Sequence, residues 1–282
     1  MIPNDNLLKV IELAYKEDVG SGDYSSLATI NSESKGKAKL LIKENGILAG
    51  VEVAQKVCNY FSKDLQLEIF KKDGDIVKKG DIAFYLYGYQ LDILKVERTL
   101  LNFMQRMSGI ATETNRYVKI LEGLETKILD TRKTTPAFRY IEKEAVKIGG
   151  GTNHRIGLFD MLMLKDNHID FCGGIENAIK KANEYLNKNN LDLKIEIETG
   201  NLKEIETVLK IGKINRIMFD NFSVEDTKTA VKMVASKYET ESSGGITFEN
   251  IRNYAETGVD FISVGALTHH IKSLDLSLKF SD

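Results

Sequence analysis

The chain has 282 residues, and 42% of them are hydrophobic, which is enough for two ordinary domains or for one α/β barrel with an addition. Its formal net charge is only −2, because lysine and arginine are balanced by acidic residues. This balance argues against non-specific nucleic-acid binding, which needs many cations on one face. No stretch approaches the run of about 20 apolar residues that a membrane helix requires. We therefore expect neither nucleic acid nor membrane as a partner.

The N-terminal segment and the cysteines indicate the compartment. Residues 1–20 have the pattern of an amphipathic helix, with Leu7 and Ile11 on one face, rather than that of a charged leader with a long apolar core. Cys58 and Cys172 lie far apart and lack metal-ligand spacing, which predicts two buried, reduced thiols and neither a disulfide nor a zinc site. A cytoplasmic protein is expected.

The N-terminal part of the chain predicts a helix followed by short strands. Strands are expected over residues 39–42 and 47–51, joined as a hairpin at Asn45-Gly46, and further strands at residues 65–70, 76–77 and 82–87. This pattern is typical of an antiparallel sheet with helices on one side.

A helical period follows from Gln90 to Gly109. Its apolar residues share one face, and Arg98, Asn102 and Gln105 share another. That polar stripe should point away from the core of the helix's own domain. Arginines at such positions are usually just solvated, so the pattern alone makes Arg98 a weak candidate for binding.

Beyond this helix, apolar strand patterns alternate with amphipathic helix patterns. The predicted strands cover residues 126–129, 161–164, 193–197, 216–219, 238–240 and 261–264, and the predicted helices cover residues 138–148, 175–186, 202–211, 224–235 and 248–255. Asn201 with Glu204 resembles a capping box, and Thr247 is a plausible N-cap. Repeated β-α units without a dinucleotide fingerprint favour an α/β barrel.

Polar residues follow each predicted strand, in the sequences DTRK, KDNH, ETG, DNF, ESSGG and GALTHH. In α/β barrels the active site lies at the carboxyl ends of the strands, so these segments should meet at one mouth. The cationic candidates there are Arg132, Lys133, His154, Arg155 and Lys165. They suit a small ligand with two carboxylates. Glu198 and Asp220 are natural Mg²⁺ ligands, although simple ion pairing with the cations would also explain them.

Glycine-rich turns supply a third feature of the predicted mouth. Ser243-Gly244-Gly245 precedes a predicted helix, and Gly265 follows the last strand before another helix-like segment. Backbone N–H groups at such helix starts bind phosphate, often at the last two strands of a barrel.

Several long motifs resemble one known family. The segments ERTLLNFMQRMSGIAT, ILDTRKTTPAFR, GGGTNHRIGLFDMLMLKDNH, IEIETGNL, IMFDNF and ESSGGITFENIRNYAETGVDFISVGALTHH closely resemble quinolinate phosphoribosyltransferases, and the likeness runs over nearly the whole chain. The resemblance implies an open-faced α/β sandwich over residues 1–108, completed by the tail 268–282. It also implies an incomplete α/β barrel over residues 109–267.

The resemblance also implies an activity and the residues that perform it. Quinolinate and phosphoribosyl pyrophosphate would give nicotinate mononucleotide, pyrophosphate and carbon dioxide, with Mg²⁺ as cofactor. Glu198 and Asp220 would be the metal ligands and, with Lys133, the catalytic residues. The substrate-binding residues would be Arg98, Thr131, Arg132, Lys133, His154, Arg155, Lys165, Ser243, Gly244, Gly245 and Gly265. A homodimer or higher homo-oligomer with a shared active site is expected, with Arg98 reaching the barrel of a neighbouring subunit.

The chain departs from the family pattern at Ala137, where glycine is usual, at Glu144, where an aromatic residue is common, and at His270, where serine is usual.

Other functions also fit parts of the pattern. These are a related phosphoribosyltransferase that uses nicotinate or serves molybdenum-associated metabolism, an aldolase with Lys165 as Schiff base, and a metabolite-binding protein without activity.

Overall fold

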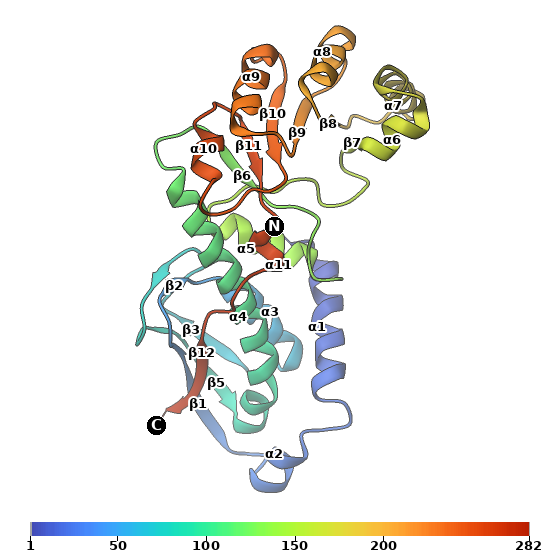
Figure 1. Ribbon diagram of the computed structural model, residues 1–282. Coiled ribbons are helices and arrows are strands. Elements are labelled where there is room, and N and C mark those ends of the chain that lie inside the picture. Colours follow the sequence, from blue (N-terminus) through green and yellow to red (C-terminus); the bar gives the residue numbers. More distant parts are fainter. Residues whose placement is uncertain (1, 282) are drawn as a thin grey trace. The chain divides into compact units, whose positions relative to one another are not determined.

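The computed structural model describes residues 2–281 and divides them into two compact units (Figure 1). Within this range the first unit takes residues 2–116, 134–150 and 267–281, and the second takes residues 117–133 and 151–266. Each unit is built on its own main sheet. The domain boundaries expected from the sequence stay a prediction.

The main sheet of the first unit is antiparallel, with strand order β12-β1-β5-β3. Its strands are β1 (Lys35–Ile42), β3 (Gln66–Ile69), β5 (Ile82–Tyr89) and β12 (Leu276–Ser281), and β2 (Gly46–Ile47) pairs separately with β4 (Ile76–Val77). In β1 the alternate residues Ala38, Leu40 and Ile42 are buried, as a strand with one face on the core requires. The C-terminal strand β12 lies beside β1, so the end of the chain completes this sheet (Figure 1).

The first unit also contains helices. They are α1 (Asn4–Asp18), α2 (Tyr24–Thr29), α3 (Val51–Phe61), α5 (Arg139–Ile148) and the long α4 (Gln90–Ile120), which continues into the second unit. Leu7 and Ile11 on α1 are buried, as the amphipathic pattern predicted. Among residues 2–281 no helix is both long and apolar enough to cross a membrane.

The hairpin predicted at Asn45-Gly46 is wrong. β1 pairs with β5 and β12, β2 pairs with β4, and residues 51–61 form helix α3 in place of the end of a strand. Gly46 serves a different purpose: a Cβ there would lie 2.8 Å from Leu274 Cδ1 and would also meet Thr112. Glycine is needed at this position for close packing, which a turn signal in the sequence does not distinguish.

The predicted end of the long helix at Gly109 is also wrong, because α4 runs on to Ile120. A Cβ at position 109 would meet the backbone of Lys272 and Ser273, which pass against the helix. This glycine therefore allows another segment to approach and does not end the helix.

The second unit contains a parallel sheet with strand order β6-β11-β10-β9-β8-β7. Its strands are β6 (Lys127–Leu129), β7 (Leu162–Leu164), β8 (Ile195–Thr199), β9 (Arg216–Asp220), β10 (Glu239–Ser243) and β11 (Phe261–Ser263). The first and last strands pair, as in a barrel, but β6 and β7 do not. The incomplete α/β barrel predicted from the sequence is confirmed. Residues 134–150, which a closed barrel would use between its first two strands, belong to the first unit.

The helices of the second unit are α6 (Asp166–Cys172), α7 (Ile175–Asn189), α8 (Leu202–Ile211), α9 (Val224–Val234) and α10 (Ile251–Ala255). Helix α11 (Ala266–His269) follows the last strand and belongs to the first unit from Leu267 on. Consecutive helices pack side by side, α7 with α8 and α8 with α9 (Figure 1). The predicted cap at Asn201 is confirmed, since its side chain accepts the Glu204 N–H at 3.1 Å. The cap predicted at Thr247 is wrong, because α10 begins later and is preceded by Asn250.

The two thiols differ in accessibility, which corrects the prediction that both are buried. Cys58 is buried on α3, whereas Cys172 at the end of α6 is half-buried, and both are free. Burial raises the pKa of the Cys58 thiol to about 12, so its thiolate is scarce near pH 8.

We expect a disulfide reagent at pH 8 to label Cys172 in the native protein and Cys58 only after unfolding. Rapid labelling of both thiols in native protein, followed by mass spectrometry of peptides, would contradict this placement.

Candidate active site

Three polar side chains lie at the carboxyl ends of neighbouring strands in the second unit. Lys165 follows β7, Glu198 is near the end of β8, and Asp220 ends β9. Because the strands are parallel, these ends share one edge of the sheet. Lys165 Nζ lies 2.8 Å from Glu198 Oε2. The structure thus brings together a predicted substrate-binding cation and a predicted metal ligand.

Glu198 and Asp220 open onto the same pocket, which has a volume of about 200 Å³. The other lining residues are Asp166, Ile169, Asp170, Ile175, Gly200 and Glu204. Glu204 is already engaged, because its carboxylate accepts the Gly200 N–H and the Asn201 side-chain amide, each at 2.8 Å. Glu198 and Asp220 therefore offer hard oxygen ligands to one space, and this donor set suits Mg²⁺.

Helix α6 adds two acids to this pocket that were not predicted as site residues. Asp166 and Asp170 are four residues apart, so they lie on one face of the helix. The signal was present in the segment KDNHID, but the helix itself was not predicted.

A buried aspartate joins the two cationic segments of the second unit. Asp130 follows β6, and its carboxylate accepts the His154 N–H at 2.8 Å and the Asn153 side-chain amide at 2.5 Å. The loop that carries Arg132 and Lys133 is thereby tied to the loop that carries His154 and Arg155. Thr131 accepts the Lys133 N–H at 3.1 Å, which shapes the same turn.

Arg132 and Arg155 lie on the two loops that Asp130 joins. Arg155 is buried, and its Nη1 donates to the carbonyl of Met161 at 3.2 Å. Burial, and after it the positive charge of Arg132, lowers the pKa of Arg155. Two guanidinium groups that repel each other are stabilised by an anion placed between them.

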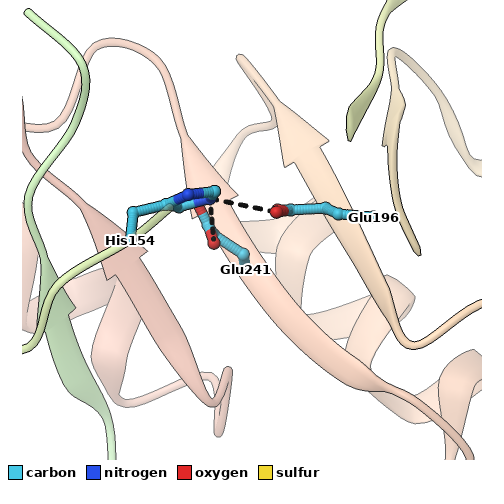
Figure 2. Close-up of side chains that lie close together, drawn as sticks. All are labelled: His154, Glu196 and Glu241. Carbon is cyan, nitrogen blue, oxygen red and sulfur yellow. Dashed lines mark ion pairs between the residues drawn. The ribbon is translucent and has the colours of Figure 1, made fainter. Parts of the chain in front are cut away.

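His154 lies in a buried cluster with Glu196 of β8 and Glu241 of β10 (Figure 2). His154 Nε2 is 3.0 Å from Glu196 Oε2 and 3.4 Å from Glu241 Oε2. Arg216 on β9 completes the cluster, since its Nη1 donates to Glu241 Oε2 at 2.9 Å and its Nη2 to Glu239 at 3.0 Å.

Two observations about the His154 ring disagree. Burial alone would lower its pKa, but bonds to Glu196 and Glu241 outweigh burial and raise it to about 9, which would put protons on both ring nitrogens. The Arg155 N–H, however, donates to Nδ1 at 2.7 Å and needs a lone pair there. Because Nδ1 accepts this N–H, a neutral ring carries its proton on Nε2. Burial, and after it the negative charge of Glu241, raises the pKa of Glu196.

His154, Glu196 and Glu241 have the residue types and the spacing of a metal site. The tautomer argues against that use, because Nε2 carries a proton and Nδ1 is occupied by the Arg155 amide. Arg216 also occupies Glu241. The cluster is a buried polar network in the interior of the barrel, in which Glu241 contacts both His154 and Arg216. Direct contact between His154 and a substrate stays a prediction.

The glycine-rich turn after β10 differs from what the sequence suggested. Ser243 ends β10, and both Gly244 and Gly245 have positive φ, 86° and 63°. The turn does not lead directly into a helix, since α10 begins only at Ile251. Backbone N–H groups for a phosphate would therefore come from the turn itself. Gly265 lies between the end of β11 and the start of α11.

Arg98 belongs to α4 within the first unit. It is exposed, as is Asn102, while Val96 and Thr99 are buried, so both side chains face away from the helix's own core as predicted. The prediction is wrong for Gln105, the third residue of the stripe, which is half-buried and donates from Nε2 to the Leu276 carbonyl of β12 at 2.9 Å. Its role as a substrate ligand stays a prediction.

Known proteins resemble the chain over nearly its whole length. Residues 23–108 match the family model of the quinolinate phosphoribosyl transferase N-terminal domain, and residues 110–279 match that of the C-terminal domain. The nicotinate-nucleotide pyrophosphorylase (carboxylating), chloroplastic, of Arabidopsis thaliana is 45% identical over 98% of this chain and 83% of its own length. A probable nicotinate-nucleotide pyrophosphorylase (carboxylating) of Bacillus subtilis is 40% identical over 96% of this chain and 92% of its own. The solved nicotinate-nucleotide pyrophosphorylase of Francisella tularensis superimposes with a TM-score of 0.92 at 40% identity, covering 100% of this chain and 98% of that one.

Proposed function

Because this chain belongs to the quinolinate phosphoribosyltransferase family, we propose that it transfers the phosphoribosyl group of phosphoribosyl pyrophosphate to quinolinate. The products are nicotinate mononucleotide, pyrophosphate and carbon dioxide, a step of de novo NAD biosynthesis. The observation that carries this proposal is the bonding of Asp130 to Asn153 and His154, which ties the loop of the buried Arg155 to the loop of Arg132, a set of cations that a planar dicarboxylate would neutralise.

The proposed quinolinate pocket consists of Arg98, Thr131, Arg132, His154, Arg155 and Lys165. The link through Asp130 supports this assignment, because it holds the loops of Arg132 and Arg155 together. His154 supports the pocket at least indirectly, since its Nδ1 fixes the Arg155 backbone. The pocket would orient the ring so that its nitrogen faces the sugar, which lowers the entropic barrier.

Glu198 and Asp220 are the proposed Mg²⁺ ligands. Their carboxylates line one pocket, and they are the two acids at the ends of β8 and β9. Bound Mg²⁺ would neutralise charge on the pyrophosphate. Lys165 forms an ion pair with Glu198. When Glu198 binds Mg²⁺, the ammonium group of Lys165 would be free to contact the substrate. Ser243, Gly244, Gly245 and Gly265 form the proposed cradle for the 5′-phosphate.

In the proposed reaction the pyridine nitrogen attacks the anomeric carbon, and pyrophosphate leaves with the electrons of the C–O bond. Lys133, next to Arg132 in the turn after β6, would stabilise the growing negative charge. The alkylated ring is a pyridinium. Loss of the adjacent carboxylate as carbon dioxide leaves an electron pair on the neighbouring ring carbon, where the positive nitrogen stabilises it until a proton from water is added.

A substrate comparison tests this assignment. A monocarboxylate would leave part of the charge of the buried Arg155 unpaired, which costs several kcal/mol in a buried site. We expect quinolinate to be used at least about a hundredfold more efficiently than nicotinate, measured as kcat/KM on purified protein. Efficient conversion of nicotinate would instead support the related phosphoribosyltransferase.

We further propose a homodimer or higher homo-oligomer with a shared active site, in the cytoplasm. Large apolar side chains exposed on the second unit support an assembly: Leu158 is 73% exposed, Phe159 67% and Phe171 90%. The two free cysteines support a reducing compartment. Cell fractionation would test the location.

Subunit exchange tests the shared site. Arg98→Ala and Lys133→Ala should each be inactive alone. A mixed dimer would contain one site that takes Lys133 from one chain and Arg98 from the other, so mixing should restore part of the activity. If exchange is demonstrated by mass spectrometry and no activity returns, Arg98 serves the site of its own subunit.

A further inference from the structure

Asn221 links two parts of the proposed site that lie far apart in the sequence, the metal ligand Asp220 and the turn at Ser243. It follows Asp220 at the end of β9, and its φ of 55° lies in the left-handed region, which asparagine tolerates better than most residues. In the register of the sheet, Asp220 lies opposite Ser243, the last residue of β10. Asn221 is therefore placed where a predicted metal ligand and the predicted phosphate turn meet.

Both the backbone and the side chain of Asn221 make contacts at this point. Its backbone N–H donates to the Ser243 carbonyl at 2.8 Å. Its side-chain Nδ2 donates to Asp220 Oδ2, also at 2.8 Å. Its side-chain Oδ1 packs so closely against Gly244 that a Cβ on Gly244 would overlap it. One amide thus touches the carboxylate on one side and the glycine turn on the other.

We propose that Asn221 is a positioning residue, which sets the distance and orientation between the Asp220 carboxylate and the Ser243-Gly244 turn. This inference rests on the proposed function. The hydrogen bond from Nδ2 restrains one oxygen of Asp220, and the same side chain supports the turn from behind. Phosphoribosyl pyrophosphate carries the pyrophosphate at one end and the 5′-phosphate at the other. A fixed distance between the metal site and the phosphate turn lets both groups bind at once, which strengthens binding.

Substitution of Asn221 should therefore act on phosphoribosyl pyrophosphate and not on quinolinate. Asn221→Asp keeps the size and the tolerance for positive φ, but it removes the donor and places a second carboxylate beside Asp220. Asn221→Gly keeps the backbone conformation and removes the whole side chain. Asn221→Asp therefore tests the hydrogen bond to Asp220, and Asn221→Gly tests the contact of the side chain with the turn.

The experiment measures binding by calorimetry, with no turnover. Phosphoribosyl pyrophosphate is titrated with Mg²⁺ present and quinolinate absent, and quinolinate is titrated separately. We expect Asn221→Asp to weaken binding of phosphoribosyl pyrophosphate at least tenfold and Asn221→Gly to weaken it less, while quinolinate affinity changes less than twofold in both. Wild-type affinity for phosphoribosyl pyrophosphate in Asn221→Asp would overturn the proposal, and so would an equal loss of both ligands, which indicates a general structural role.

A second measurement keeps the test informative if the turn is merely perturbed. Gly244→Ala should be less harmful in the Asn221→Gly background than in wild type, because the overlap with the side chain is gone. Purely additive losses in a double-mutant cycle would contradict the contact. Failure of the proposed function has a different signature, since wild-type protein would then bind neither quinolinate nor phosphoribosyl pyrophosphate.

Discussion

Asp220→Asn should reduce magnesium-dependent turnover on the order of a hundredfold or more, because several kcal/mol of charge stabilisation depend on a metal ligand. The amide is of the same size but lacks the negative oxygen that Mg²⁺ prefers. Quinolinate affinity should be almost unchanged, since the proposed quinolinate pocket lies on other residues. Steady-state kinetics over a range of Mg²⁺ concentrations, together with calorimetry of quinolinate, measures both effects.

Asp170→Asn is a matched control for this variant. Asp170 lines the same pocket from α6 but is not a proposed ligand, so its loss should change turnover less than about threefold. If Asp220→Asn abolished quinolinate binding and kept a normal response to Mg²⁺, the assignment of Asp220 would be wrong.

Arg216→Met should destabilise the protein by about 3–5 kcal/mol, because it leaves the buried Glu241 without the guanidinium group that it bonds. Arg216 bonds both Glu239 and the fully buried Glu241. Methionine fills much of the same volume, so the loss reports mainly on charge. Urea denaturation at neutral pH measures the change in the free energy of unfolding.

The double variant Arg216→Met with Glu241→Leu provides the control. Replacing a buried ion pair by apolar side chains is often close to neutral, so the double variant should recover a substantial part of the stability. If the double variant were as unstable as the sum of the single ones, packing and not charge would explain the effect.

The positions of the barrel strands along the chain and the polar character of their ends could be predicted from the sequence, because parallel strands and amphipathic helices have different apolar periods. Lys165, Glu198 and Asp220 were chosen for that reason, and the structure places Glu198 and Asp220 around one pocket and Lys165 against Glu198. Long motifs that resemble a known family supplied the remaining residues.

Other features depend on contacts between distant segments. Glu196 and Glu198 lie on one face of β8, but only the fold shows that Glu196 meets Glu241 and His154. Gly46 and Gly109 are required by the segments that pack against them, and a single sequence does not reveal which glycines have this role. Asn221 is chemically ordinary until the neighbouring strand places Ser243 and Gly244 beside it.

The stoichiometry of product release tests the proposed reaction most directly. Purified protein is incubated with quinolinate labelled in the carboxylate next to the ring nitrogen, phosphoribosyl pyrophosphate and Mg²⁺, and carbon dioxide and pyrophosphate are measured together. The proposed reaction predicts equal amounts of the two, with little of either when Mg²⁺ is chelated. Pyrophosphate release without carbon dioxide, or no dependence on quinolinate, would contradict it.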